Sequence, residues 1–130
     1  MKRYSDKGLE KRKEERKAFP EFFQKHIQYI RDNNLCCEEC GARLKGDVSE
    51  IAHILPKSTF KSIATNDDNV LYLCGMWSNS QCHSNYDNYP AEKVKKMKIF
   101  RKVSERFHIL EQEIIEKITY KIEERYTWQA

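Results

Sequence analysis

Apolar residues in the first third of the chain recur mostly at three- and four-residue steps, which predicts an amphipathic helix. Pro20 suits the first turn of this helix, and the polar residues 32–34 end it. His26 is expected at its surface. The preceding residues 2–17 mix basic and acidic side chains, which fits a solvated helix or frayed terminus as well as an arm that contacts phosphate. The apolar stripe consists of Phe19, Phe22, Phe23, Ile27 and Ile30.

The middle of the chain has short apolar runs bounded by Gly, Asn, Asp and Pro, and these predict short strands and turns. Residues 41–46 are expected to form a turn, although residues 41–45 would also suit the partner strand of a hairpin. A hairpin followed by a crossing helix gives a ββα arrangement. The expected elements are a strand over 48–55 ended by Pro56, a connection over 57–68 with a helical turn at 59–64, an apolar run over 70–73 and a short helix over 82–89 stopped by Pro90.

The last forty residues have no Gly or Pro, and their apolar positions predict a long helical segment. The spacing is that of a heptad seam for two heptads and then drifts towards the 3.6-residue helical period. We expect this seam to pack on the stripe of the first helix, so that both flanks brace the middle of the chain. A homodimer through the C-terminal helix is the alternative. The seam consists of Phe100, Val103, Phe107, Leu110 and Ile114, followed by Ile118 and Ile122.

Length and composition indicate one polar domain of 130 residues, with 39% apolar and 34% charged side chains. No apolar run approaches the roughly 20 residues that cross a bilayer, so no membrane partner is expected. The charged N-terminus is not followed by an apolar run, which argues against a secretory signal. Five cysteines without such a signal favour a reducing, cytoplasmic location and thiolate ligands over disulfides.

The net charge of +4 is unevenly distributed. Residues 1–34 carry a net +4, residues 35–90 a net −3 and residues 91–130 a net +3. An acidic centre between basic flanks suits a module that must accept a polyanion such as DNA. These three segments are the expected organisation of a single compact α+β domain.

Four of the cysteines are spaced as ligands of a structural zinc ion. Cys37 and Cys40 have the two-residue gap of a zinc knuckle, and Cys74 with Cys82 would complete a tetrahedral four-thiolate site. The seven residues between the second pair are more than such pairs usually have. Cys36 could replace Cys37, but the two-residue gap favours Cys37. Buried free cysteines are the alternative.

A second set of residues lies between and beside these cysteines, and with them it resembles the HNH endonucleases, the ββα-metal nucleases. The resemblance covers about residues 35–90. Its motifs are Ala52-His53-Ile-Leu-Pro56, Asn69 five residues before Cys74, and Cys82-His83-Ser-Asn-Tyr-Asp87. Compact proteins of this kind resemble those of phages, mobile elements and restriction systems.

The resemblance implies a metal-dependent DNA endonuclease with a ββα-metal core. His53 would be the general base that activates water, Asn69 would hold the loop that carries the base, and His83 would bind a divalent metal. Asp87 lies one helical turn after His83 and is the natural second ligand. Mg²⁺ or Mn²⁺ is expected, with Ni²⁺ or Zn²⁺ as alternatives.

Position 52 departs from the family pattern, because many HNH enzymes carry Asp or His immediately before the base. Here the residue is Ala52. Glu50 would lie roughly 7 Å back along a strand, and its side chain could span part of that distance directly or through water. More simply, His83 and Asp87 would hold the ion with waters and the substrate phosphate.

Basic residues beside this module are candidates for DNA contacts. The alternative function is a non-catalytic zinc-binding nucleic-acid module, which leaves the two histidines, Asn69 and Asp87 without a role. A helical interaction protein explains only the C-terminal segment. The candidate DNA-binding residues are Lys57, Lys61, Lys93, Lys95, Lys96 and Arg101.

Overall fold

The computed structural model describes residues 6–128, and for residues 6–18 it describes the backbone alone. In this part of the chain the fold is α+β, with five α-helices, two 3-10 turns and one two-stranded antiparallel sheet. The helices are α1 (Asp6–Asn33), α2 (Cys82–Asn88), α3 (Ala91–Val94), α4 (Phe100–Leu110) and α5 (Tyr120–Tyr126). The strands are β1 (Ile51–His53) and β2 (Val70–Tyr72), and the 3-10 turns are η1 (Val48–Glu50) and η2 (Lys61–Ile63).

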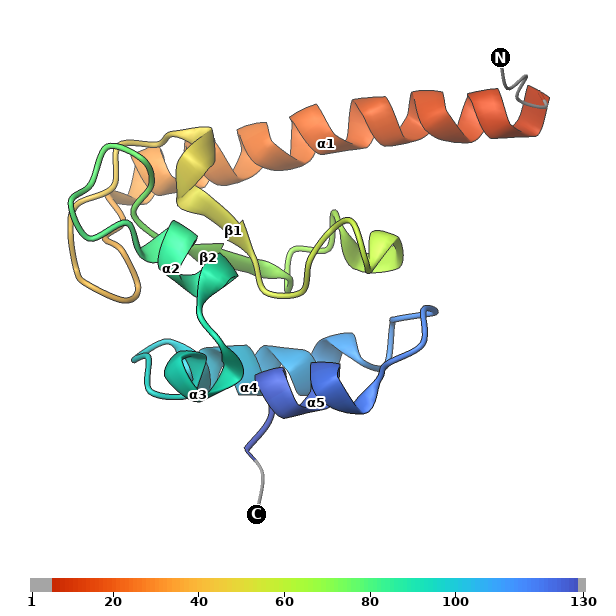
Figure 1. The fold of residues 1–130 in the computed structure, drawn as a ribbon. Helices are drawn as coiled ribbons and strands as arrows, with labels where there is room; N and C mark the ends of the chain where they lie inside the picture. The colour runs from red at the N-terminus through yellow and green to blue at the C-terminus, as the bar shows by residue number, and fades with distance from the viewer. Residues whose placement is uncertain (1–5, 129–130) are drawn as a thin grey trace.

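The elements form three layers, which Figure 1 shows from the side. Helix α1 lies along one side, the sheet and α2 lie in the middle, and α3, α4 and α5 lie on the opposite side. Buried apolar side chains from all three layers form one continuous core. Among the described residues, no helix combines the length and the apolar character that crossing a bilayer requires.

Helix α1 begins well before the predicted start, so Pro20 lies in its interior instead of its first turn. Its N-terminal half continues past the rest of the fold (Figure 1). Phe22 and Ile30 are buried and face the sheet, as the predicted stripe requires. The prediction that His26 lies at the surface is wrong, because its side chain is buried next to β2. The predicted phosphate contacts of residues 2–17 lie outside the described side chains.

The predicted strand over 48–55 is shorter in the structure, because its first three residues form the turn η1. Asp47 accepts a hydrogen bond from the Ser49 amide, and the Glu50 carboxylate accepts one from the Asp47 amide. This reciprocal capping box starts a helical turn and competes with an extended conformation. Strand β1 pairs with β2 in the register Ile51↔Tyr72, Ala52↔Leu71 and His53↔Val70. Residues 41–45 are therefore not its partner strand.

The predicted long C-terminal helical segment is three short helices instead, with breaks at residues 95–99 and 111–119. The second break contains the β-branched residues Ile114, Ile115, Ile118 and Thr119, which lower helix propensity. After this break α5 turns back onto α4, and the rings of Phe107 and Tyr126 stack with 5.8 Å between their centroids.

The C-terminal seam does not pack on α1 as predicted, because the sheet layer separates α4 from α1 (Figure 1). Helix α1 packs against β1, while α4 packs against α5. Phe100, Val103, Phe107 and Leu110 are all buried within this chain. These four seam residues therefore belong to the core of this chain.

Candidate functional site

The four predicted zinc ligands form a cluster at one end of the sheet. The sulfur atoms of Cys37, Cys40, Cys74 and Cys82 all lie within 4.8 Å of one another. A tetrahedral zinc ion with Zn–S bonds of about 2.3 Å separates its sulfurs by about 3.8 Å. The Cys40 and Cys74 sulfurs are 3.7 Å apart, so the cluster could hold a metal ion such as zinc. Cys36 is exposed and lies outside it.

Local backbone geometry prepares this cluster for a cation. Gly41 follows Cys40 with a φ of 81°, which few other residues adopt, and its amide donates to the Cys37 carbonyl to close the knuckle turn. The Cys40 and Cys82 amides donate to the sulfurs of Cys37 and Cys74. Burial raises the pKa of the Cys37 and Cys82 thiols. A bound dication would offset that cost by stabilising the thiolates.

The chain passes directly from this cluster to the second candidate site, because α2 begins at Cys82 and His83 is its second residue. The Nε2 atom of His83 lies 3.1 Å from Oδ2 of Asp87, one turn further along α2. The Nδ1–H group of His83 donates to the Ser49 carbonyl over 2.6 Å. Hydrogen bonding to Asp87 raises the pKa of His83, and burial opposes that rise.

The His83–Asp87 pair fits a small divalent cation. Two adjacent ligands of an octahedral Mg²⁺ ion at about 2.1 Å lie about 3.0 Å apart, close to the 3.1 Å that separates Nε2 and Oδ2. The Ser49 carbonyl fixes the tautomer that leaves Nε2 free to ligate, as partners of metal-bound histidines commonly do. Gly75 leaves room for Ser49 beside it, because a Cβ atom at residue 75 would lie 2.1 Å from Ser49 Oγ.

His53 is the last residue of β1, and its imidazole has a defined orientation. Its Nε2–H donates to the Ala64 carbonyl over 2.8 Å, which leaves Nδ1 as the proton acceptor of the neutral ring. Phe22 stacks on the ring at 5.6 Å between centroids, and Phe23 meets it edge-on at 6.0 Å. Burial lowers the pKa of His53, and the charge of Lys57 adds to this effect. This lowered pKa favours the neutral form of the ring.

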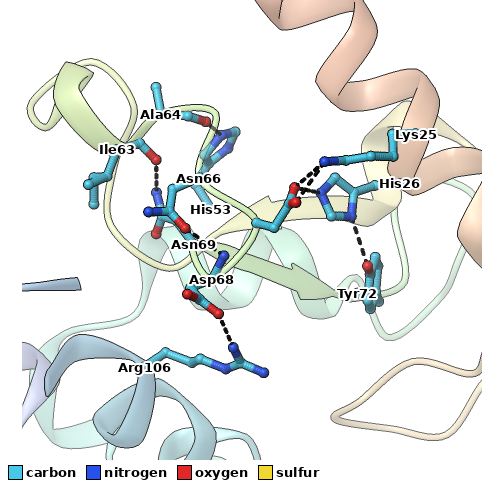
Figure 2. Close-up of polar contacts among 11 residues, drawn as sticks. Lys25, His26, His53, Ile63, Ala64, Asn66, Asp68, Asn69, Tyr72 and Arg106 are labelled. Carbon is cyan, nitrogen blue, oxygen red and sulfur yellow. Dashed lines mark hydrogen bonds and ion pairs between the residues drawn. The ribbon is translucent and has the colours of Figure 1, made fainter. Parts of the chain in front are cut away.

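Asn69 is fully buried and joins the end of β1 to the loop that follows η2. Its Oδ1 accepts from the Leu55 amide over 2.7 Å, and its Nδ2 donates to the Leu55 and Ile63 carbonyls. Ile63 directly precedes Ala64, whose carbonyl orients His53. Asn69 therefore holds both segments that fix the imidazole of His53 (Figure 2).

One pocket of about 490 Å³ brings His53, His83 and Asp87 together. Two cations also line this pocket, Lys57 after β1 and Arg125 on α5. A histidine that can accept a proton, a His–Asp pair that could ligate a metal, and two positive charges thus line one open cavity. That combination suits binding and hydrolysis of a phosphate ester.

The structure removes Glu50, the fallback ligand that the sequence allowed. Glu50 is fully buried, and its carboxylate accepts hydrogen bonds from the amides of residues 45–47 and from Trp77 Nε1. The side chain of Asn85 donates to the Ser80 carbonyl. Ala52 is also fully buried and does not line the pocket. His83 and Asp87 both line the cavity and could ligate an ion.

The predicted DNA-binding cations are spread over the molecule. Lys57 is at the pocket, with its Nζ 5.4 Å from the ring centroids of Phe19 and Phe23. Lys61 is exposed on η2. Lys93 and Lys96 line a separate hollow beside Cys82, and Lys95 follows the end of α3. Arg101 is exposed and pairs with Glu105 at 3.4 Å.

Arg125 is the pocket residue that the sequence reasoning missed. Its guanidinium donates to the Tyr86 and Tyr89 carbonyls at the C-terminal end of α2, over 2.6 and 2.5 Å. No local motif marks this arginine, because the contact joins segments 36 residues or more apart. The turn η1 was also missed, although Asp47-Val-Ser-Glu50 has the spacing of a capping box.

No protein-family model matches the chain, and neither the curated proteins nor the solved structures gave a match. The chemistry of the site must therefore be argued from its own residues.

Proposed function

We propose that the protein is a metal-dependent DNA endonuclease of the HNH type. The observation that carries the proposal is the shared pocket, in which His53 lines the same cavity as the His83–Asp87 pair. The order of β1, β2 and α2 along the chain fits a ββα-metal core. The motifs that resemble the family fall on those three elements and on the Asn69 loop.

In this proposal His53 is the general base. Neutral Nδ1 accepts a proton from the attacking water, and the Nε2–H bond to the Ala64 carbonyl stabilises the imidazolium that forms. Asn69 keeps the ring in place by holding the two loop segments around it. Lys57 and Arg125 supply positive charge for the phosphate that enters the pocket.

His83 and Asp87 would hold the catalytic divalent cation, Mg²⁺ or Mn²⁺. Such an ion supplies electrostatic stabilisation of the developing phosphate charge and of the leaving oxygen. With two protein ligands, the remaining positions fall to water and substrate, which predicts weak metal binding. The cysteine cluster is the structural zinc site, because soft thiolates and the harder imidazole–carboxylate pair select different ions.

Plasmid cleavage tests the proposal directly. Protein that retains its zinc but has been freed of weakly held ions by gel filtration is assayed with Mg²⁺, Mn²⁺, Ni²⁺ or Zn²⁺, beside His53→Ala and His83→Ala. We expect nicking or linearisation by the parent only when a divalent ion is added. Loss of the base in His53→Ala should lower the rate on the order of 10²–10⁴-fold with DNA binding retained.

The Asp87→Ala variant tests whether Asp87 binds the metal ion or affects cleavage in some other way. It should raise the metal concentration required for half-maximal cleavage, while His83→Ala should be nearly inactive. DNA binding without cleavage under every metal condition would favour the zinc-binding nucleic-acid module instead. Parental cleavage by His53→Ala would remove His53 from the catalytic role.

A further inference from the structure

Helix α1 is connected to His53 through a continuous set of contacts. His26 of α1 bonds to Asp67 in the loop that follows η2, and this same loop begins at Ala64, whose carbonyl orients His53. Figure 2 shows His26 of α1 reaching towards this loop and towards Tyr72, with His53 bonded at the loop's other end. A flank that the sequence analysis treated as a brace therefore touches the loop that determines the orientation of the ring.

Both nitrogens of His26 have specific partners. A carboxylate only accepts hydrogen bonds, so Nε2–H donates to Asp67 Oδ1 over 3.0 Å. Nδ1 then accepts from the Tyr72 hydroxyl over 2.8 Å. Burial raises the pKa of Tyr72 to about 12, which keeps the donor proton on the phenol. His26 thus has one fixed tautomer and joins β2 to the loop.

A second route runs through aromatic packing. Phe22, one turn before His26 on α1, lies 4.7 Å from the His26 ring and 5.6 Å from the His53 ring, measured between centroids. His26 is therefore connected to His53 on two sides. Phe22 contacts the face of the His53 ring, and the loop that His26 binds contains Ala64, whose carbonyl accepts from His53 Nε2.

The loop that contains Ala64 and Asp67 is compact and has its own hydrogen bonds. The Asp68 amide donates to Asn66 Oδ1 over 2.8 Å, and the Asn69 amide donates to the Asn66 carbonyl over 2.9 Å. Arg106 of α4 binds Asp68 from the opposite layer (Figure 2). Consecutive carboxylates are thus held by α1 on one side and by α4 on the other.

We propose that His26 is a positioning residue for His53, acting through Asp67 and the 64–69 loop. The inference deepens the proposed function and rests on the role of His53 there. Lys25 and Arg106 reach the same two aspartates, but these ion pairs are substantially exposed and solvent weakens them. The side chain of His26 is only 8% exposed, whereas that of Lys25 is 58% exposed, so solvent weakens the His26 contact to Asp67 less than the Lys25 contact.

The test compares His26→Phe, which keeps an aromatic ring but removes both hydrogen bonds, with His26→Gln, which can restore one of them. We expect His26→Phe to lower kcat about tenfold, with KM for DNA within about twofold, because misplaced catalytic groups lose rate more than binding. His26→Gln should recover part of the rate. Lys25→Gln, which removes the exposed charge from Asp67, is the matched control and should stay near the parental rate.

A readout that does not depend on cleavage is the tautomer of His53, measured by ¹⁵N NMR of the imidazole. The parent should show the Nε2–H form, and His26→Phe should shift it towards a mixture. Phe107→Leu in the α4 core is the control for lost stability alone, and it should leave the tautomer unchanged.

An unchanged His53 tautomer in His26→Phe, or a loss of kcat no larger than that of Phe107→Leu at equal stability, would overturn the positioning role. A protein that cuts no DNA but shows the tautomer shift would refute the proposed function alone. The two failures are therefore distinguishable.

Discussion

The imidazole of His53 is held on three sides, by the Ala64 carbonyl at Nε2 and by Phe22 and Phe23 at its ring. The residue also lines the pocket that contains His83 and Asp87. This arrangement gives a neutral acceptor with one orientation, which is what proton removal near neutral pH requires.

The pH dependence of cleavage should reflect this environment. Because burial lowers the pKa of His53 below its usual 6.5, the rate should rise with pH only below that value and be level from pH 7 upward. Lys57→Gln removes a charge that lowers the same pKa, so its acid limb should move to higher pH. Lys61→Gln is the control. Cleavage rates measured from pH 5 to 8.5 at saturating metal test this shift. If the acid limbs of the parent and of Lys57→Gln coincide, Lys57 does not affect the pKa of His53.

Ala52 occupies the position at which many HNH enzymes carry Asp or His, and a single substitution would not place a metal ligand in the pocket here. Its side chain is fully buried and paired with Leu71. Ala52→Asp should lower the free energy of unfolding by about 1–3 kcal/mol, because an unpartnered polar group is buried. Val48→Asp, at an exposed position on the rim of the pocket, should change it by less than about 0.5 kcal/mol. Urea unfolding measures both, and a stable Ala52→Asp with tighter metal binding would show that the carboxylate reaches the cavity.

At the scale of elements, residue spacing predicted the segments that contain the candidate site residues better than it predicted how the helices pack. The knuckle, the short helix at Cys82 and the helical turn near residue 61 follow from local signals, and each is present. The break after Leu110 and the position of α4 depend on which surfaces meet in three dimensions. Periodicity identifies a buried face but does not identify its partner, and for this reason α4 was assigned to the wrong neighbour.

His26 and Arg125 show the same limit within the site. Each is a single polar residue on an otherwise ordinary helix, and each acts on a segment about 40 residues away. The HNH-like motifs could be found because their residues are close in sequence. The side chains that support them from α1 and α5 have no such neighbours, so they were visible only in the structure.

The cysteine cluster should be required for folding of the middle layer. Cys40→Ser removes one thiolate, and we expect loss of the zinc and a lower melting temperature, because structural zinc contributes binding energy to the folded state. Cys36→Ser is the matched control, since Cys36 lies outside the cluster. Metal analysis should find about one zinc per chain in the parent and in Cys36→Ser. Equal stability and zinc content in Cys40→Ser would remove this residue from the site.

Helix α2 is held at both ends, by the cysteine cluster and by Arg125 at its C-terminal carbonyls. Arg125→Met leaves two carbonyls unpaired next to Asp87, so the metal concentration for half-maximal cleavage should rise, by up to about tenfold as for other supporting residues of metal sites. Arg125→Lys should not restore it, because an ammonium cannot reproduce the planar fork. Arg101→Met is the control. The measurement is a titration of cleavage against Mn²⁺. An unchanged midpoint in Arg125→Met would contradict a role for Arg125 in supporting the metal site.

At the scale of the whole molecule, the buried histidines link stability to pH. Burial lowers the pKa of both His26 and His53, so below about pH 6.5 the unfolded chain binds more protons than the folded one. Their contribution to stability is therefore complete above that pH and is lost as the pH falls below it. Asp67 raises the pKa of His26 and Lys25 lowers it, while Tyr72 faces its other nitrogen.

We expect the free energy of unfolding to decrease from pH 7 to pH 5, and to decrease less in His26→Phe. His83 acts in the opposite sense because its pKa is raised, and it is common to both proteins. Urea unfolding of the two proteins at several pH values makes the comparison. Parallel curves would show that His26 does not contribute to the pH dependence.

The adjacency of Cys82 and His83 has a consequence for how such a chain can change over generations. One peptide bond joins Cys82 of the cysteine cluster to His83 of the pocket, so the two sites keep a fixed rotation relative to each other about the α2 axis. A single inserted residue between them would turn His83 by about 100° around the helix axis while every ligand stayed in the sequence. A change in length at this junction should therefore be poorly tolerated. Among natural variants, insertions should therefore occur in the loop from Gly75 to Gln81 and not between Cys82 and His83.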